Sequence, residues 1–408
     1  MEPRELRGME LAATRTISKK GDIWIVPSQS GNGTYRVHLM PKIASCTCPD
    51  FETRGCKCKH IFAATFVLRR EQNSDGTVTV TRAIQMSAAT QTTYPQAWPA
   101  YNEAQTTEKE KFLQLLADLC DGIPLGPQVK KNGRPSLPLS DALFSVTFKV
   151  YSTLSGRRFM CDLREAQTKG FIDKTPCYNS IFNYLENPEL APIIKSLIIQ
   201  SSLPLASVEN NFAADSSGFM TSRFSRWYDH KYGVEREQHD WVKCHLMCGV
   251  KTNIVTAVEI DGRHAADTKM LPALAKSTAM NFTMREVSAD KGYASKANFE
   301  AIAHLGAVPF ISFPANHTGQ GGGKWAEMYH YFNFRKQEFL AHYHKRSNVE
   351  SAFSMMKRKF GDSIRSKTDT AMVNEVLCKI LCHNLVVLIH EMYELGIDPV
   401  FWQKPVVQ

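Results

Sequence analysis

Residues 343–357 read YHKRSNVESAFSMMK, and they indicate a helix that carries its chemistry on one face. The stretch contains neither proline nor glycine, the residues that most often interrupt a helix. Four side chains follow one another at intervals of three, four and seven residues: Tyr343, Arg346, Glu350 and Lys357. Because a helix has about 3.6 residues per turn, we expect all four to point the same way.

An adjacent stripe of the same helix is apolar and consists of Val349, Phe353 and Met356. This stripe predicts that the helix packs on a core by one face and presents Glu350, between two cations and a phenol, on the next. Taken alone, this pattern is equally compatible with a surface salt bridge. The carboxylates upstream in the chain therefore decide between the two interpretations.

Two upstream carboxylates, Asp215 and Asp290, each stand where a predicted strand gives way to small and glycine residues. Asp215 follows a predicted strand over residues 208–214, and Asp290 lies in the sequence REVSADKGYAS. An acid at the exit of a strand lies at the rim of the sheet, where sites are commonly built. An acid inside the strand would instead be buried without a partner. We therefore expect both carboxylates at a sheet rim.

The order of the three acids, two at strand ends and one on a helix, suits a site for two divalent cations. Hard cations such as Mg²⁺ take oxygen ligands. Two such ions, about 3.5–4 Å apart, can clamp the attacking and leaving oxygens of an in-line phosphoryl displacement.

Three motifs together resemble the signature of DDE insertion-sequence transposases, which have a ribonuclease H-like catalytic core. The resemblance covers about residues 135–395, and the last motif matches at every fixed position. The motifs fix residue types and spacings as well as the order of the acids. They are Asp215, Asp290-x-Gly292-Tyr293 and Tyr343-x2-Arg346-x3-Glu350-x6-Lys357.

This resemblance implies an enzyme that hydrolyses DNA at the ends of a mobile element and then joins the freed 3′-hydroxyl to target DNA. Asp215, Asp290 and Glu350 would be the catalytic residues and would hold two Mg²⁺ ions, for which Mn²⁺ can substitute. The partners would be double-stranded DNA, as terminal inverted repeats and as target, and a second copy of the chain in a homodimer on DNA. The alternative is a domesticated or regulatory DNA-binding protein that keeps this fold without transposition.

The resemblance also implies that the other residues of the last motif contact DNA. Tyr343, Arg346 and Lys357 would handle phosphates near the scissile bond, and Tyr293 of the second motif would assist them. Trp325 lies in a glycine-rich insertion, residues 314–337, where it could stack on an extruded base. A loop with buried aromatic residues is the more ordinary interpretation of that insertion.

Asp267, at the start of a predicted helix, is a lesser candidate for the metal site. Its sequence context, DGRHAAD, is equally typical of a residue that caps the helix N-terminus. Both interpretations remain open on the sequence alone.

The N-terminal residues predict a small module stabilised by zinc. Residues 22–44 read as two strands around a glycine and asparagine turn, and CTCPDFETRGCKCKH then leads into a helix. So small a segment buries too little apolar surface to be stable without a metal. The pattern C-x-C-x9-C-x-H resembles the SWIM zinc finger. Its ligands to one structural Zn²⁺ would be Cys46, Cys48, Cys58 and His60, with Cys56 as a competing ligand.

These patterns divide the chain into five parts: a zinc finger over 1–72, a linker over 73–107, a helical DNA-binding region over 108–205, a catalytic domain over 206–395 and a tail over 396–408. The predicted fold class is α+β / α/β. It consists of a ribonuclease H-like mixed sheet with flanking helices, preceded by a helical region and a small zinc-binding ββα module.

Composition adds weaker constraints. The chain has 408 residues and a formal charge of +9, which favours a polyanionic partner. Its eleven cysteines include four within thirteen residues, which is not the pattern of a secreted disulfide framework. We find no run near the roughly 18 apolar residues that span a bilayer and no N-terminal signal region. We therefore expect a soluble cytoplasmic protein without membrane contact.

Overall fold

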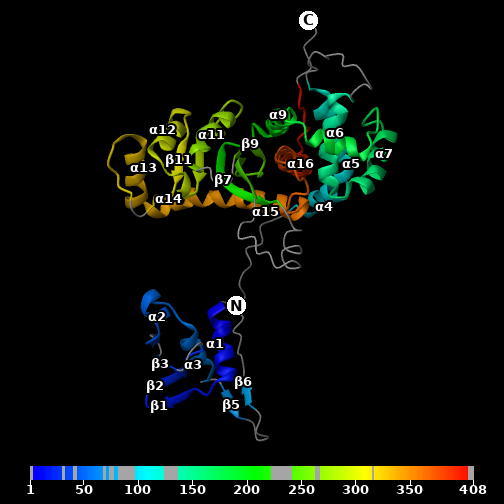
Figure 1. The fold of residues 1–408 in the computed structure, drawn as a ribbon. Coiled ribbons are helices and arrows are strands. Elements are labelled where there is room, and N and C mark those ends of the chain that lie inside the picture. Colours follow the sequence, from blue (N-terminus) through cyan, green and yellow to red (C-terminus); the bar gives the residue numbers. More distant parts are fainter. Residues whose placement is uncertain are drawn as a thin grey trace. The chain divides into compact units, whose positions relative to one another are not determined.

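The computed structural model describes residues 3–29, 33–39, 44–67, 70–72, 78–80, 97–123, 137–221, 241–261, 267–314 and 317–402. The chain divides into two compact units, Met1–Tyr94 and Pro95–Gln408 (Figure 1). This boundary falls inside the predicted linker, but the linker does not extend to residue 107, because helix α4 (Trp98–Thr106) already belongs to the second unit.

The first unit is larger than the predicted ββα module. Its antiparallel sheet has the order β1-β2-β3-β4, and the N-terminal helix α1 packs on α3, which follows the cysteine-rich loop. Alternate residues of the central strands, Trp24, Val26 and Val37, point into its core. The elements are α1 (Pro3–Thr14), β1 (Ser18–Lys20), β2 (Ile23–Pro27), β3 (Thr34–Leu39), β4 (Ala44–Cys46), α2 (Pro49–Arg54), α3 (Lys59–Val67), β5 (Arg70–Gln72) and β6 (Val78–Val80).

The second unit contains the predicted mixed sheet, with the strand order β11-β10-β7-β8-β9. Strands β7, β8 and β9 are antiparallel neighbours, whereas β10 and β11 run parallel to β7. The first and fourth strands of the sheet in chain order, β7 and β10, lie side by side. The strands are β7 (Asn211–Met220), β8 (Trp241–Gly249), β9 (Val255–Asp261), β10 (Glu286–Ala289) and β11 (Val308–Ile311).

The sheet separates two apolar cores. Ala213 and Phe219 of β7 face the core that contains helices α9 and α16, while Phe212 and Ala214 face the core beneath α11 and α12. This is the alternation expected of a strand that is covered on both sides. The helices that follow β9 are α11 (Leu271–Ala279), α12 (Lys296–His304), α13 (Gly323–Phe334), α14 (Lys336–Tyr343), α15 (Ser347–Phe360) and α16 (Asp369–Glu394), with short 3-10 turns η2 (Asp267–Lys269), η3 (Lys291–Tyr293) and η4 (His344–Arg346).

The helices that precede the sheet do not form a separate domain. Helix α16 packs against α4, α5, α6, α8 and α9, and also against β8 and β9 (Figure 1). One continuous apolar core therefore joins the predicted helical region to the predicted catalytic domain. The preceding helices are α5 (Glu108–Asp121), α6 (Leu139–Ser152), α7 (Gly156–Thr168), α8 (Tyr178–Leu185) and α9 (Leu190–Ser202), with the turn η1 (Leu203–Leu205).

Helix α16 bears on the expectation that the chain has no apolar segment long enough to span a bilayer. Its length and composition would suffice to cross a membrane, yet 89% of its apolar window is buried inside the protein, as in the core helix of a globular fold. It is the single described helix that passes this test.

Residues 343–357 are helical, as predicted, but not as one continuous helix. Helix α14 ends at Tyr343, the turn η4 follows, and α15 begins at Ser347. The apolar stripe of Val349, Phe353 and Met356 is buried in the core that also contains α16. The insertion over 314–337 is also partly helical, because it contains α13.

Asn384 of α16 connects three elements in the middle of this core. Its side-chain amide donates to the carbonyl oxygens of Ile198 and Val255 and to Ser201 Oγ, and its Oδ1 accepts the Val255 N–H at 2.9 Å. The residue is completely buried, so water cannot replace these bonds.

We expect Asn384→Leu to lower the free energy of unfolding by about 3 kcal/mol, because it leaves buried backbone groups without partners. Urea unfolding of the full chain, followed by the helical circular dichroism signal, measures this change. Asn102→Leu on the exposed side of α4 is the control and should stay within about 0.5 kcal/mol of the unchanged protein. Equal effects of the two substitutions would show that the Asn384 bonds do not stabilise the core.

Candidate active site

The two aspartates meet at a step in the sheet. Strand β10 pairs with residues 211–214 of β7 and ends at Ala289, so Asp290 and Asp215 each follow the last residue of that pairing. Asp215 itself does not end its strand, because β7 continues to Met220 beside β8. The expectation that Asp215 stands at the exit of its strand was therefore wrong, whereas Asp290 does follow the end of β10. The rim at Asp215 exists because its partner strand β10 is short.

Strand alternation determines which side of the sheet carries the site. Asp215 and Ser217 have the same parity as Ala213 and Phe219, so they face the core on which α15 packs. Glu350 lies in the first turn of α15. A carboxylate is stabilised at that position, because the N-terminus of a helix carries a partial positive charge.

The last motif contacts all three acids. Arg346 bridges two of them, with Nη1 at 3.1 Å from Asp215 Oδ2 and Nη2 at 2.6 Å from Glu350 Oε1. The Tyr343 hydroxyl donates to Asp290 Oδ1 at 3.4 Å. The three acids named by the sequence are thus brought to one place by residues 343–350.

Burial and charge both act on Asp215, whose side chain is 19% exposed. Burial raises the pKa of its carboxyl, and the charges of Asp290 and Glu350 raise it further. The Ser216 N–H, at 2.8 Å from Oδ1, and the Arg346 guanidinium oppose this rise. The rim therefore concentrates negative charge that calls for a cation.

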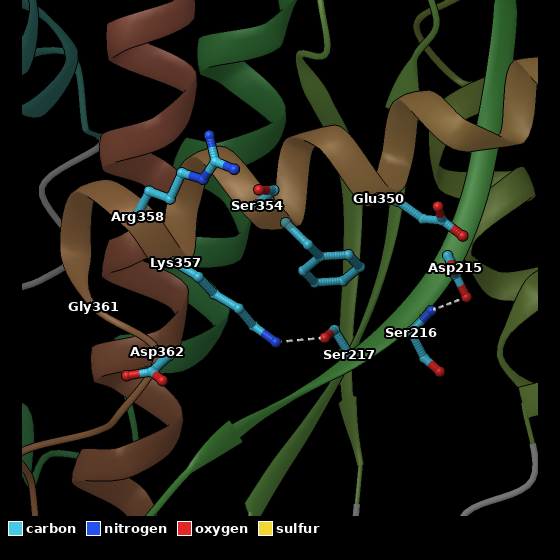
Figure 2. A pocket seen from close by; sticks show the side chains of 10 residues that line it. Asp215, Ser216, Ser217, Glu350, Ser354, Lys357, Arg358, Gly361 and Asp362 are labelled. Carbon is cyan, nitrogen blue, oxygen red and sulfur yellow. Dashed lines mark hydrogen bonds between the residues drawn. The ribbon is translucent and has the colours of Figure 1, made fainter. Parts of the chain in front are cut away.

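A pocket of about 790 Å³ extends from Asp215 and Glu350 along α15, and Asp290 is not part of its lining. Figure 2 shows Asp215 and Glu350 facing each other at one end, with Lys357 directed at Ser217 further along. Lys357 Nζ donates to Ser217 Oγ at 2.7 Å, and burial lowers the pKa of its ammonium group. The lining residues are Asp215, Ser216, Ser217, Glu350, Phe353, Ser354, Lys357, Arg358, Gly361 and Asp362.

The lining residues Ser217 and Asp362 were not among the sequence candidates. Ser217 could have been predicted from the sequence. It lies two residues after Asp215, so the two side chains share a face of the sheet if the strand continues past Asp215. Asp362 had no such signal, since its position depends on the turn after α15.

Asp267 lies on the other face of the sheet. Its Oδ1 pairs with Lys243 Nζ at 2.5 Å and accepts Ser216 Oγ at 3.3 Å, and Ser216 alternates away from Asp215 along β7. Its carboxylate is therefore committed to contacts beneath the rim. This position argues against its lining the metal site, and it begins the turn η2 without a side-chain cap bond to it.

Two aromatic residues do not reach the surface. Tyr293 is 1% exposed, and its hydroxyl lies 3.3 Å from His245 Nδ1. Trp325 is 4% exposed, packs against Phe299 and Phe313, and donates from Nε1 to the Thr318 carbonyl. The expectation that both contact DNA is corrected, because apolar packing takes the faces that a base would need.

The cysteine-rich loop forms a second candidate centre in the first unit. The ligand atoms of Cys46, Cys48, Cys58 and His60 lie within 4.8 Å of one another, and all four residues are buried. His60 Nδ1 is 3.9 Å from the sulfurs of both Cys46 and Cys58. Three soft sulfurs and one imidazole nitrogen are the donor set of a closed tetrahedral zinc site.

The competing ligand Cys56 lies outside this cluster. Its side chain is exposed, and its sulfur accepts a hydrogen bond from Arg4 Nη1 at 3.1 Å. Within the cluster, hydrogen bonding to Cys46 lowers the pKa of the Cys58 thiol to about 3 and raises that of the Cys46 thiol.

We expect Cys58→Ser to abolish binding of one zinc ion and to loosen the first unit, because the remaining three ligands no longer close a tetrahedron. Cys56→Ser is the matched control and should retain the zinc. Atomic absorption gives the zinc content of each purified protein. Loss of zinc from the Cys56→Ser protein, and not from the other, would reverse the assignment.

Comparison with known proteins agrees with both centres. Residues 207–385 match the family described as Transposase DDE domain, and residues 35–68 match the SWIM zinc finger. No curated protein matches this chain. A cryo-EM structure of the piggyBac transposase synaptic complex with hairpin DNA is distantly similar, with 8% identity, a TM-score of 0.35, and coverage of 71% of this chain and 73% of that one. A likeness this remote carries no argument of its own.

Proposed function

We propose that this chain, which matches the transposase DDE domain over residues 207–385 and the SWIM zinc finger over residues 35–68, is the DNA transposase of an insertion sequence. The observation that carries the proposal is the contact of residues 343–350 with Asp215, Asp290 and Glu350 at one sheet rim. Its substrates would be the terminal inverted repeats of the element and the target DNA. We place its action in the cytoplasm, on DNA, as a homodimer.

The acids of the rim fit divalent cations. Their carboxylate oxygens are the donors that Mg²⁺ prefers, and two of the acids already share one cation, the Arg346 guanidinium. We propose that Asp215, Asp290 and Glu350 hold two Mg²⁺ ions, with Mn²⁺ as a substitute. Bound there, the ions would activate water and then a 3′-hydroxyl for attack on phosphorus.

The cations of the last motif have a separate task. Lys357 points into the pocket from α15, about two helical turns beyond Glu350. Arg358 lines the same pocket. We propose that Tyr343, Arg346 and Lys357 hold phosphates of the strand being cut. Charge-assisted hydrogen bonds from such groups fix the scissile phosphate beside the acids without specifying sequence.

The zinc centre has a structural task in this proposal. All four ligands are buried and all come from the protein, so no open position remains for water or substrate. We propose that one Zn²⁺ bound by Cys46, Cys48, Cys58 and His60 stabilises the first unit, which then contacts DNA or protein.

Transfer of a marked DNA segment tests the proposed function. The segment is placed between the sequences that flank the gene and is offered with a target plasmid and Mg²⁺. We expect joined products from the unchanged protein and none from Asp290→Ala, because that substitution removes a metal ligand. DNA binding without joining by the unchanged protein would favour the domesticated or regulatory alternative.

We expect Glu350→Gln to reduce strand cleavage at least about a hundredfold, since even residues that only support a metal ligand contribute that much. Binding of the DNA should persist, because glutamine keeps the size of a side chain that is 52% exposed. Glu338→Gln is the matched control: Glu338 also pairs with an arginine, Arg335, and is 58% exposed on α14. Cleavage by Glu350→Gln at the control rate would remove Glu350 from the catalytic site.

A further inference from the structure

A second pocket, of about 310 Å³, lies between α6, α8 and the segment that joins α15 to α16. We call it the α6–α8 pocket. Its volume is at the lower end of the range for small-ligand sites. Nothing in the comparisons or in the proposed catalytic mechanism uses it. Its polar and aromatic lining includes Lys149, Phe182, Glu186, Arg365, Lys367 and Glu375.

Lys149 is the feature that calls for a ligand. Its side chain lines the pocket, the residue is 6% exposed, and it makes no hydrogen bond or ion pair with any residue in the described part of the chain. Its ammonium group is reached from the pocket, where an anion can pair with it. Burial lowers the pKa of Lys149; the charge of Glu375 opposes this shift, and the charge of Arg365 adds to it.

The two acids of the pocket do not supply that partner. Both carboxylate oxygens of Glu375 accept backbone N–H groups, from Arg365 at 3.0 Å and from Ser366 at 2.8 Å, and Lys379 lies 3.9 Å away. Glu375 thus holds the backbone of the joining segment. Glu186 is exposed at the edge of the pocket.

Two further cations line the α6–α8 pocket without a carboxylate partner among the described residues. The Arg365 guanidinium donates to the carbonyl oxygens of Thr153 and Leu154, which leaves its charge uncompensated. Lys367 is exposed. With Lys149, these cations give the pocket an excess of positive charge, the property that attracts phosphate.

One wall of the pocket is aromatic. Phe182 of α8 is 39% exposed, an unusual position for a large apolar side chain in a pocket lined by cations. A base has an apolar face that can stack on such a ring. Cations and an exposed aromatic ring together match the two parts of a nucleotide.

The α6–α8 pocket is close to the active site along the chain. Asp362 lines the active-site pocket and Arg365 lines the second pocket, three residues later. Three residues span at most about 11 Å, and a DNA strand rises about 3.4 Å per nucleotide. A strand at the Asp362 end of the active-site pocket is therefore within about three nucleotides of Arg365.

We propose that the α6–α8 pocket binds one nucleotide of the DNA strand held in the active site. Its phosphate is held by Lys149, Arg365 and Lys367, and its base stacks on Phe182. This inference rests on the proposed function for the source of the strand, and it adds a DNA contact beyond the Asp362 end of the active-site pocket.

Binding without divalent metal tests this site independently of catalysis. The probe is a single-stranded oligothymidylate that contains a photoreactive 5-iododeoxyuridine, bound to the full chain at several salt concentrations. Each of Lys149→Met and Lys367→Met should reduce the slope of log affinity against log salt by about 0.7, the value for one phosphate contact on a single strand. Irradiation of the unchanged protein should link the probe to the peptide that contains Phe182.

Lys276→Met, an exposed lysine on α11, is the matched control and should leave the slope unchanged. Thermal unfolding checks that Lys149→Met is folded; if it is not, the exposed Lys367 carries the test. Slopes equal to the control together with no link at Phe182 would overturn the proposal. A second result would also overturn the proposal. It is that inorganic phosphate or thymidine monophosphate protects Lys149 from an acylating reagent while the oligonucleotide does not. Because no step needs cleavage, an inactive enzyme would not affect either result.

Discussion

Three carboxylates in one place repel one another, and the architecture of the second unit follows from holding them together. Arg346 compensates Asp215 and Glu350 at once, and Tyr343 donates to Asp290. Both residues come from the junction of α14 and α15, where the turn η4 interrupts the helix. The break places Glu350 in a first helical turn, where the partial positive charge of the helix end also favours a carboxylate.

The position of this junction depends in turn on the sheet and on α16. Because β10 is shorter than β7, the rim leaves Asp215 partly exposed while Phe212, Ala213 and Ala214, beside β10, stay buried. The turn after α15 is held from behind, since the buried Lys379 of α16 donates to the carbonyl oxygens of Gly361 and Ser363. Burial lowers the pKa of Lys379 to about 8, and these carbonyls supply the partners that a buried ammonium needs. The core helix thus positions the far end of the active-site pocket.

Sequence reasoning identified the chemistry more completely than the packing. The acids Asp215, Asp290 and Glu350, and the four clustered ligands of the first unit, were identified because fixed residue types recur at fixed spacings. The burial of Tyr293 and Trp325 could not be predicted, since an aromatic residue beside a glycine-rich loop suits a core as well as a surface. The difference in length between β7 and β10 could not be predicted either, because the end of a strand depends on where its pairing with the neighbouring strand ends. The merging of 108–205 with the sheet depends on tertiary contacts of α16.

The two proposed metal centres differ in the hardness of their donors, and this difference lets one chain select two metals. Cys46, Cys48 and Cys58 offer soft sulfurs with His60 in a buried cluster, which favours Zn²⁺ and excludes water. The rim offers carboxylate oxygens beside an open pocket, which favours Mg²⁺ and leaves room for a nucleophile. Neither donor set competes well for the other ion. If both proposed sites are filled, a structural zinc ion would stay bound while ions at the rim exchange with the solution, and the stability of the first unit would not depend on the reaction at the rim.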